Sequence, residues 1–223
     1  MNGVEGLAPY RPQIDALRDV GQMLWQRGWS VGTSSNYSVV VGRDPLRILI
    51  TASGKDKGRL GPDDFVVVGD DGRGAWPGQA KSSAETLLHV VAAQQPGVGA
   101  VLHTHSVWCT LLSDYFFSQG GLVLEGYEML KGFAGVTTHE TRAWIEIFEN
   151  TQDIPSLAEK VRERMTDVAS PMKFGYLIRK HGLYTWGVDL EEARRHIEVM
   201  EFLLECTGRK LLLEGAISAA VVA

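Results

Sequence analysis

Residues 86–113 of the chain read TLLHVVAAQQPGVGAVLHTHSVWCTLLS and contain no Asp, Glu, Lys or Arg. Such a gap is unexpected in a chain of 223 residues of which 22% are charged. Gln94, Gln95, Pro96 and Gly97 interrupt the segment, so no apolar run approaches the ~20 residues that cross a bilayer. The segment therefore predicts elements buried within a globular fold, not a membrane span.

The charge-free segment divides into a helix, a turn and a strand. A helix is predicted from Ser82, because the sequence Ser-Ser-Ala-Glu that ends at Glu85 is typical of a capping box and an apolar stripe follows it. A Pro-Gly pair ends this helix. Residues 99–103 then form a short apolar run typical of a buried strand, and residues 107–112 begin another helix.

The rest of the chain alternates between strand and helix patterns. Helices are predicted at residues 11–28, at 155–168 and from 189 onward, with the tail after Gly215 frayed or docked against a neighbour. Short β-branched or aromatic runs predict strands at 37–41, 47–51, 65–68, 145–148, 175–179 and 183–186. We expect one α/β domain across residues 1–223, with its core within about 11–207, because no repeat or linker divides these elements.

The composition excludes several classes of protein. Hydrophobic residues make up 44% of the chain, which excludes a disordered protein. The net charge of −5 disfavours a general nucleic-acid binder, which needs a basic surface. Residues 1–12 lack the features of a secretory signal, and Cys109 and Cys206 are too few for a disulfide framework. We expect a cytoplasmic protein with no membrane or nucleic-acid partner.

The charge-free strand leads directly into His103-Thr104-His105. Side chains at positions i and i+2 of a strand share a face and lie roughly 6.6 Å apart along the backbone. Two imidazoles placed in this way can converge on one metal ion, whereas the alternative is a pair of hydrogen-bonded polar residues at a strand end. Buried imidazoles need partners, and this need favours the metal site.

A catalytic zinc site normally takes three protein ligands, so a third histidine is required. His181 is the best candidate from context, because it lies between two short predicted strands and precedes Gly182, where a tight turn would present it rigidly. His89 is interpreted as a core or lining residue and His196 as part of a solvated helix face. His139 has no strong context.

Two further segments have the features of a phosphate site. Thr51, Ser53 and Gly54 follow a predicted strand, and Ser83 lies at the start of a predicted helix, where backbone amides favour an anion. The alternative is that the first segment is a plain turn and the second a plain helix cap.

These motifs in combination identify a family. The sequence contains Thr33-Ser-Ser-Asn36, Thr51-Ala-Ser-Gly54-Lys-Asp-Lys57, Ser82-Ser-Ala-Glu85, His103-Thr-His105-Ser, Glu128-Met-Leu-Lys-Gly132 and His181-Gly-Leu-Tyr-Thr-Trp-Gly187. From about residue 14 to residue 207 it resembles the class II aldolase and adducin superfamily. The resemblance implies an α/β fold with a central, mainly antiparallel sheet flanked by helices, and a homotetramer with active sites near subunit boundaries.

The resemblance also implies functional residues. One zinc ion per subunit is bound by His103, His105 and His181, although three histidines also suit iron, cobalt or manganese. The family pattern adds Asn36 to the phosphate contacts on the segments around Ser53 and Ser83. It makes Lys57 a candidate for additional positive charge.

Two carboxylates compete for the role of acid and base. In the sugar-phosphate aldolases of the superfamily, the carboxylate follows the serines at the helix start, which corresponds to Glu85. In the dehydratases it comes from the Glu-Met-hydrophobic-Lys-Gly segment, which corresponds to Glu128. A capping box would occupy Glu85, and we therefore favour Glu128.

The activity implied is zinc-dependent loss of water from the sugar phosphate 5-methylthioribulose 1-phosphate, a step of methionine salvage. The alternatives are a sugar-phosphate aldolase, a pentulose-phosphate epimerase, and a non-catalytic interaction domain of the adducin type. Ala84, where the aldolases tend to carry a second serine, weakens the aldolase interpretation. An apolar slot for the methylthio group could be formed by Trp108, Phe116, Phe117 and Phe133, although core packing is favoured for most of these side chains.

Overall fold

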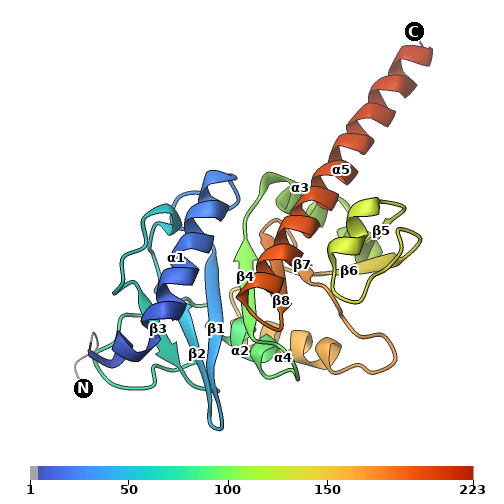
Figure 1. Ribbon diagram of the computed structural model, residues 1–223. Coiled ribbons are helices and arrows are strands. Elements are labelled where there is room, and N and C mark those ends of the chain that lie inside the picture. The colour runs from blue at the N-terminus through green and yellow to red at the C-terminus, as the bar shows by residue number, and fades with distance from the viewer. Residues whose placement is uncertain (1–4, 223) are drawn as a thin grey trace.

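Eight strands form one sheet in the order β3-β2-β1-β4-β8-β7-β6-β5 (Figure 1). The computed structural model describes residues 5–222. The strands are β1 (Asn36–Arg43), β2 (Leu46–Thr51), β3 (Phe65–Val68), β4 (Ala100–Thr104), β5 (Gly121–Glu125), β6 (Arg142–Phe148), β7 (Tyr176–Ile178) and β8 (Gly182–Gly187). Every neighbouring pair is antiparallel except β6 and β7. The expectation of a mainly antiparallel sheet is confirmed.

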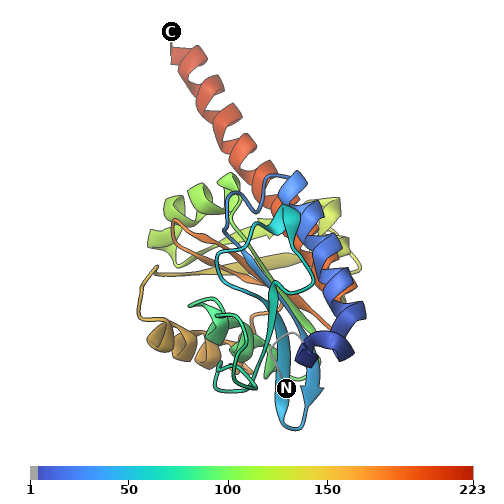
Figure 2. The ribbon, with the colours of Figure 1, turned by 90° about the vertical axis from the view of Figure 1, so that its left-hand side faces the viewer.

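Helices cover both faces of this sheet (Figures 1 and 2). The α-helices are α1 (Arg11–Gln26), α2 (Thr86–Ala93), α3 (Val107–Tyr115), α4 (Ile154–Met165) and α5 (Leu190–Val222). The 3-10 helices are η1 (Glu5–Tyr10), η2 (Lys57–Arg59), η3 (Phe117–Gln119) and η4 (Glu128–Gly132). One core contains α1, α3 and α5, and the opposite one contains α2 and α4. Within the described residues, no helix has the length and apolar character needed to cross a membrane.

Strand β4 lies in the middle of the sheet and is buried on both faces. Leu102 packs into the core beneath α1 and α5, whereas Val101 packs into the core beneath α2 and α4. Because side chains alternate along a strand, the same alternation directs His103 to the α2 side and Thr104 to the α5 side. Burial on two faces is the reason that β4, at the centre of the charge-free segment, contains no charge.

The structure corrects the prediction for the start of α2. The helix begins at Thr86, and its N-cap residue, Glu85, makes no side-chain capping bond. Ser82 instead forms an isolated β-bridge with Ala52, which holds the segment extended up to the serines. The expected capping box is therefore absent, and the carboxylate of Glu85 is available for other partners.

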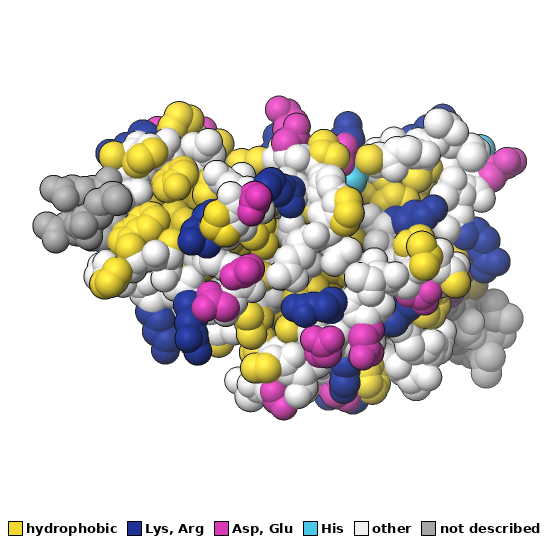
Figure 3. All heavy atoms as spheres, turned by 90° about the horizontal axis from the view of Figure 1, so that it is seen from below, with side chains coloured by type: hydrophobic (Ala, Val, Ile, Leu, Met, Phe, Trp, Pro, Cys, Tyr) yellow, Lys and Arg dark blue, Asp and Glu magenta, His cyan; other side chains and the backbone are white. Residues whose placement is uncertain are grey.

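Other element boundaries also differ from the prediction. Strand β5 was not predicted, and α4 ends at Met165 rather than at residue 168. Helix α5 continues through Gly215 to Val222, and its last turns project from the body of the molecule (Figure 1). The tail is therefore not frayed, and its docking against a neighbour stays a prediction. On the face shown in Figure 3, side chains of both charges are interspersed.

Candidate active site

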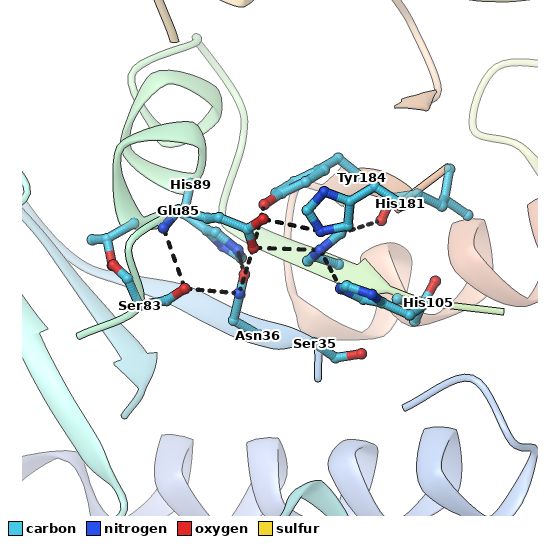
Figure 4. Close-up of polar contacts among 12 residues, drawn as sticks. Ser35, Asn36, Ser83, Glu85, His89, His105, His181 and Tyr184 are labelled. Carbon is cyan, nitrogen blue, oxygen red and sulfur yellow. Dashed lines mark hydrogen bonds and ion pairs between the residues drawn. The ribbon is translucent and has the colours of Figure 1, made fainter. Parts of the chain in front are cut away.

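Three histidines converge at the end of β4 (Figure 4). His103 lies in β4, His105 follows it by two residues, and His181 lies in the turn between β7 and β8. One ring nitrogen of each lies within 4.8 Å of those of the other two, and the Nε2 atoms of His103 and His105 are 2.8 Å apart. The structure thus brings together the three residues that the sequence singled out.

The ring of His103 is held in one orientation. Its Nδ1 lies 2.9 Å from the carbonyl oxygen of Leu183, which can only accept, so Nδ1 carries the proton and Nε2 carries a lone pair. The ring stacks on Tyr184, its cross-strand partner in β8, with centroids 4.0 Å apart. A metal-binding histidine is commonly oriented by such a hydrogen bond from its second nitrogen.

Burial favours the neutral form of two of these rings. It lowers the pKa of His103 well below its ordinary value, and it lowers the pKa of His105 to about 4, with His181 adding to the effect. Neutral imidazoles are the form that binds a metal ion. The chemistry of the donor set therefore fits a divalent transition metal.

A tight turn presents His181 to the other two histidines. The backbone N–H of His181 donates to the carbonyl of Ile178, and Lys180 adopts a positive φ of 53°. Gly182 allows β8 to approach β4, because a Cβ atom at this position would lie 2.2 Å from the carbonyl oxygen of Thr104. A side chain here would separate the two strands that carry the histidines.

Glu85 completes the cluster (Figure 4). Its Oε1 lies 3.0 Å from Nε2 of His181, and its Oε2 lies 3.5 Å from Nε2 of His103. Oε2 also accepts hydrogen bonds from Nδ2 of Asn36 at 3.1 Å and from the hydroxyl of Tyr184 at 3.3 Å. Burial alone would raise the pKa of Glu85, but the two histidines and Asn36 together hold it well below its usual range. Glu85 is thus a carboxylate at the histidine centre.

Glu128 lies elsewhere on the chain surface, in η4. Its side chain is 70% exposed and pairs with Lys131, and its Oε2 lies 3.5 Å from Nδ1 of His139. The hydrogen bond from Lys131 lowers the pKa of Glu128 below its ordinary value. The structure of one chain does not bring Glu128 to the histidine cluster.

A polar cavity of about 150 Å³ opens beside the histidines. It is lined by Thr33, Ser34, Ser35, Asn36, Ala52, Ser53, Gly54, Lys57, Ser83, Glu85, His105 and His181. Five of the six predicted phosphate contacts line it. The sixth, Thr51, is buried in the sheet, where its hydroxyl accepts from the backbone N–H of Tyr37. Larger hollows of about 570 and 600 Å³ lie elsewhere and contain no histidine.

Lys57 supplies positive charge to this cavity. The side chain is only 1% exposed, and Nζ donates to the carbonyl oxygens of Lys55 at 2.7 Å and of Thr33 at 3.3 Å. Burial lowers the pKa of Lys57 to about 8, although Asp56 and Asp64 oppose the shift. A buried ammonium among hydroxyl groups is suited to an anion such as phosphate.

The sequence interpretation missed one neighbour of the site, Tyr184, and misplaced one histidine outside the site, His196. Tyr184 stacks on His103 and contacts Glu85, and its position within the motif that begins at His181 was the available signal. His196 was expected on a solvated face but is buried, with Nδ1 bonded to the carbonyl of Trp186 and Nε2 accepting from Ala134 N–H. The prediction for His196 is therefore wrong.

None of the four aromatic residues considered for an apolar slot lines the cavity. Phe133 is buried and stacks on Phe174. The ring of Trp108 packs directly on Gly208, so closely that a Cβ atom at residue 208 would lie 2.2 Å from it. Phe116 and Phe117 pack against the same core. Core packing accounts for all four.

Comparison with known sequences gives consistent matches. Residues 15–207 match the family described as "Class II Aldolase and Adducin N-terminal domain". The chain is 49% identical over 198 residues to methylthioribulose-1-phosphate dehydratase from Marinobacter nauticus, which is 88% of this chain and 93% of that protein. It is 50% identical over 196 residues to the protein of the same name from Pseudomonas aeruginosa, with 87% and 93% covered.

Solved structures share the fold at lower identity. L-fuculose-1-phosphate aldolase from Thermus thermophilus matches with a TM-score of 0.72 and 24% identity, covering 92% of this chain and 98% of that one. A sugar-phosphate aldolase from Thermotoga maritima matches with a TM-score of 0.67 and 19% identity, covering 92% and 97%. At these identities the similarity shows the fold alone.

Proposed function

Because this chain belongs to the class II aldolase and adducin family, we propose that it removes water from 5-methylthioribulose 1-phosphate. The product is 2,3-diketo-5-methylthiopentyl 1-phosphate, and the reaction is a step of methionine salvage. The observation that carries the proposal is a three-histidine cluster joined to a cavity with a buried cation. The two cysteines are both free thiols, which supports a cytoplasmic location.

We propose Zn²⁺, one ion per subunit, as the metal. His103, His105 and His181 would hold it, with the carboxylate of Glu85 within reach of the same centre. When bound, the metal supplies Lewis-acid stabilisation of the negative charge that develops on the C2 oxygen. Three protein nitrogens leave positions open for substrate oxygens.

The cavity beside the cluster is the proposed phosphate site. Asn36, Ser53, Gly54, Lys57 and Ser83 line it. A phosphate held there would position C2 and C3 of the sugar toward His105 and His181, which line the same cavity. Thr51 would support the segment of Ser53 and Gly54 from inside the sheet, where its hydroxyl accepts a hydrogen bond from the N–H of Tyr37.

We propose Glu128 as the acid and base. The carboxylate would take the C3 proton, and the same proton would then assist departure of the C4 hydroxyl as water. The enol that remains converts to the diketone. Glu128 is exposed, and its partners within its own chain are Lys131 and His139 rather than the three clustered histidines. This role therefore requires that it enters the cavity of a neighbouring subunit.

An exposed apolar stripe on α3 supports this arrangement. Val107, Leu111 and Tyr115 are all exposed and recur every four residues along α3, the helix that follows His105. An exposed apolar stripe of this kind marks a protein interface. We propose a homotetramer in which subunit boundaries lie near the active sites.

A second candidate function is metal-dependent cleavage of a sugar phosphate or its epimerisation. Glu85 favours it, because this carboxylate contacts the histidine centre within one chain. A non-catalytic interaction domain is disfavoured, since the chain has a complete set of metal ligands.

The deciding experiment is an assay of the purified protein with 5-methylthioribulose 1-phosphate, with zinc restored and after chelation. We expect diketone formation that chelation abolishes and zinc restores. Fuculose 1-phosphate and pentulose phosphates should be offered in parallel, with C–C cleavage as the readout. A zinc-loaded protein that cleaves these sugars and leaves 5-methylthioribulose 1-phosphate unchanged would overturn the proposal.

A further inference from the structure

His89, a histidine without a role in the proposed mechanism, lies beside the candidate active site (Figure 4). It belongs to α2 and is completely buried. Its Nδ1 lies 2.8 Å from Oγ of Ser38, and its Nε2 contacts Oδ1 of Asn36. Asn36 lines the cavity and donates through Nδ2 to Glu85. A continuous polar chain therefore runs from Ser38, inside the sheet, to the carboxylate of Glu85.

Burial lowers the pKa of His89 to about 3, and with a neutral ring only one arrangement of protons satisfies this chain. The carboxylate of Glu85 accepts, so the nitrogen end of the Asn36 amide must face it. The oxygen end then faces His89 and can only accept, so Nε2 of His89 carries the proton. Nδ1 consequently has a lone pair that accepts from the hydroxyl of Ser38. The tautomer of His89 and the orientation of the Asn36 amide fix one another.

The alternative amide orientation is unfavourable. If Asn36 were reversed, its oxygen would face the carboxylate of Glu85 at 3.1 Å, and two acceptors would meet without a proton between them. The nitrogen end of Asn36 also contacts Oγ of Ser83 at 3.3 Å. His89 thus holds the amide from behind, while Glu85 and Ser83 receive its two N–H groups at the cavity wall.

His196 shows what a purely structural histidine looks like in this chain. Both residues lie in helices, are almost fully buried and have both ring nitrogens bonded. The partners of His196 are backbone groups, the carbonyl of Trp186 and the N–H of Ala134. The partners of His89 are two side chains, one of which lines the cavity. An apolar residue would fill the place of His89 without the cost of burying an imidazole.

We propose that His89 is a positioning residue that holds the amide of Asn36 with its nitrogen toward Glu85 and the cavity. Without this contact the amide can rotate, and Glu85 loses a donor that fixes its orientation. The inference rests on the proposed function, because its kinetic consequence is measured in the dehydration reaction. The tautomer of His89 and the orientation of the Asn36 amide can be determined without measuring that activity.

A joint X-ray and neutron structure of the wild-type protein tests the structural content. We expect deuterium on Nε2 of His89, none on Nδ1, and a deuterated Asn36 amide nitrogen facing Glu85. Deuterium on Nδ1 with Nε2 bare would overturn the proposal. This result is obtained even if the protein fails to dehydrate the substrate, so failure of the positioning role and failure of the proposed function remain distinguishable.

Two amide variants test the kinetic content. In His89→Gln the side-chain nitrogen can reach the position of Nε2, whereas in His89→Asn it reaches only that of Nδ1. We expect His89→Asn to lower kcat about 10- to 100-fold with zinc content unchanged, as for other residues that orient an active-site group. His89→Gln should stay within about threefold of wild type, since it keeps the donor to Asn36. Equal kcat values for the two folded variants would contradict the proposal.

The matched control is His196. His196→Asn should lower Tm, because it removes the contact between Nε2 and the N–H of Ala134, and should leave kcat unchanged. A double-mutant cycle with Asn36→Ala completes the test, since His89→Asn should have little further effect once Asn36 is absent. A full and independent loss in the Asn36→Ala background would overturn the assignment.

Discussion

Glu85 and Glu128 occupy opposite kinds of environment. Glu85 has 14% of its side chain exposed and contacts His103, His181, Asn36 and Tyr184. Glu128 has 70% exposed, and its carboxylate contacts Lys131 and His139. The partners of Glu85 all come from its own chain and enclose its carboxylate. The carboxylate of Glu128 is open to solvent and has no contact with the histidine cluster of its own chain.

The difference concerns what a single chain can specify. The carboxylate of Glu85 is fixed by four side chains, so its position is determined before substrate arrives. Glu128 lies in η4 and pairs with the exposed Lys131. An exposed ion pair of this kind contributes little to fixing a side chain. A catalytic role for Glu128 therefore depends on assembly, and the two regions respond differently to mutation.

The largest effect is expected from removing a histidine of the cluster beside Glu85. His103→Ala should lose zinc and lower kcat/KM by at least about 1,000-fold, because the Lewis-acid contribution of several kcal/mol is lost. Metal analysis and the dehydration assay check this outcome. A folded His103→Ala that retains a full equivalent of zinc and wild-type turnover would remove the histidine cluster from the mechanism.

The next effect separates the two carboxylates. Glu128→Gln should retain zinc and lower kcat about 100- to 10,000-fold, since a general acid and base is lost. Glu85→Gln should weaken zinc retention about 10- to 100-fold, and added zinc should restore part of its turnover. Metal content and kcat of both variants check the contrast. The roles are reversed if zinc-loaded Glu85→Gln is inactive while Glu128→Gln is active.

A mixing experiment sharpens the same contrast. Glu128→Gln and His103→Ala are each expected to be inactive alone. When the two chains are co-expressed, about a quarter of the sites should combine an intact cluster with an intact Glu128 if the glutamate comes from a neighbouring subunit. No recovery in mixed oligomers would place Glu128 within its own chain's site or outside the mechanism.

Sequence reasoning succeeded where the local pattern determines the structure. The pattern His103-Thr104-His105 predicted that the two rings converge, and they do at the end of β4, although the strand itself stops at Thr104. The turn after β7 accounts for His181. Val101 and Leu102 are apolar because both faces of β4 are buried. The motifs around these residues also identified the family.

It failed where tertiary contacts override a local signal. Residues 82–85 match a capping box, but Glu85 bonds to His181 and Tyr184, which lie about a hundred residues away in sequence. His196 follows the half-buried Arg194 and the exposed Arg195, yet its helix turns it inward to the N–H of Ala134. Strand β5 lies at the edge of the sheet and pairs only with β6, so its pattern was short and weak.

A smaller effect is expected in the cavity next to Glu85. Lys57→Met should raise KM roughly 100-fold, because a buried ammonium no longer meets the phosphate, and should leave kcat nearly unchanged. The matched control is Lys55→Met, since Lys55 is half-exposed and pairs with Asp64. Steady-state kinetics of both variants check the prediction. Equal KM values for the two variants would show that Lys57 does not bind the phosphate.

The smallest effect concerns a third glutamate, on the opposite face of β4. Glu201 of α5 is buried and accepts from the hydroxyl of Thr104, between the two histidines of the strand, while its Oε2 has no partner. Burial raises the pKa of Glu201 from 4.5 to about 7. The folded state therefore binds this proton more tightly than the unfolded state does.

The sign of the pH dependence follows from that raised pKa. The stabilisation is complete below pH 4.5 and is lost as the pH rises through about 7, with a decrease of about 2 kcal/mol between pH 5 and 7. Glu201→Gln has no such proton, so the difference in unfolding free energy between wild type and variant should change by this amount over the same range. Denaturant titrations at several pH values measure it. Parallel curves would show that Glu201 is ionised in the folded protein. Burial beside β4 would then not raise the pKa of Glu201.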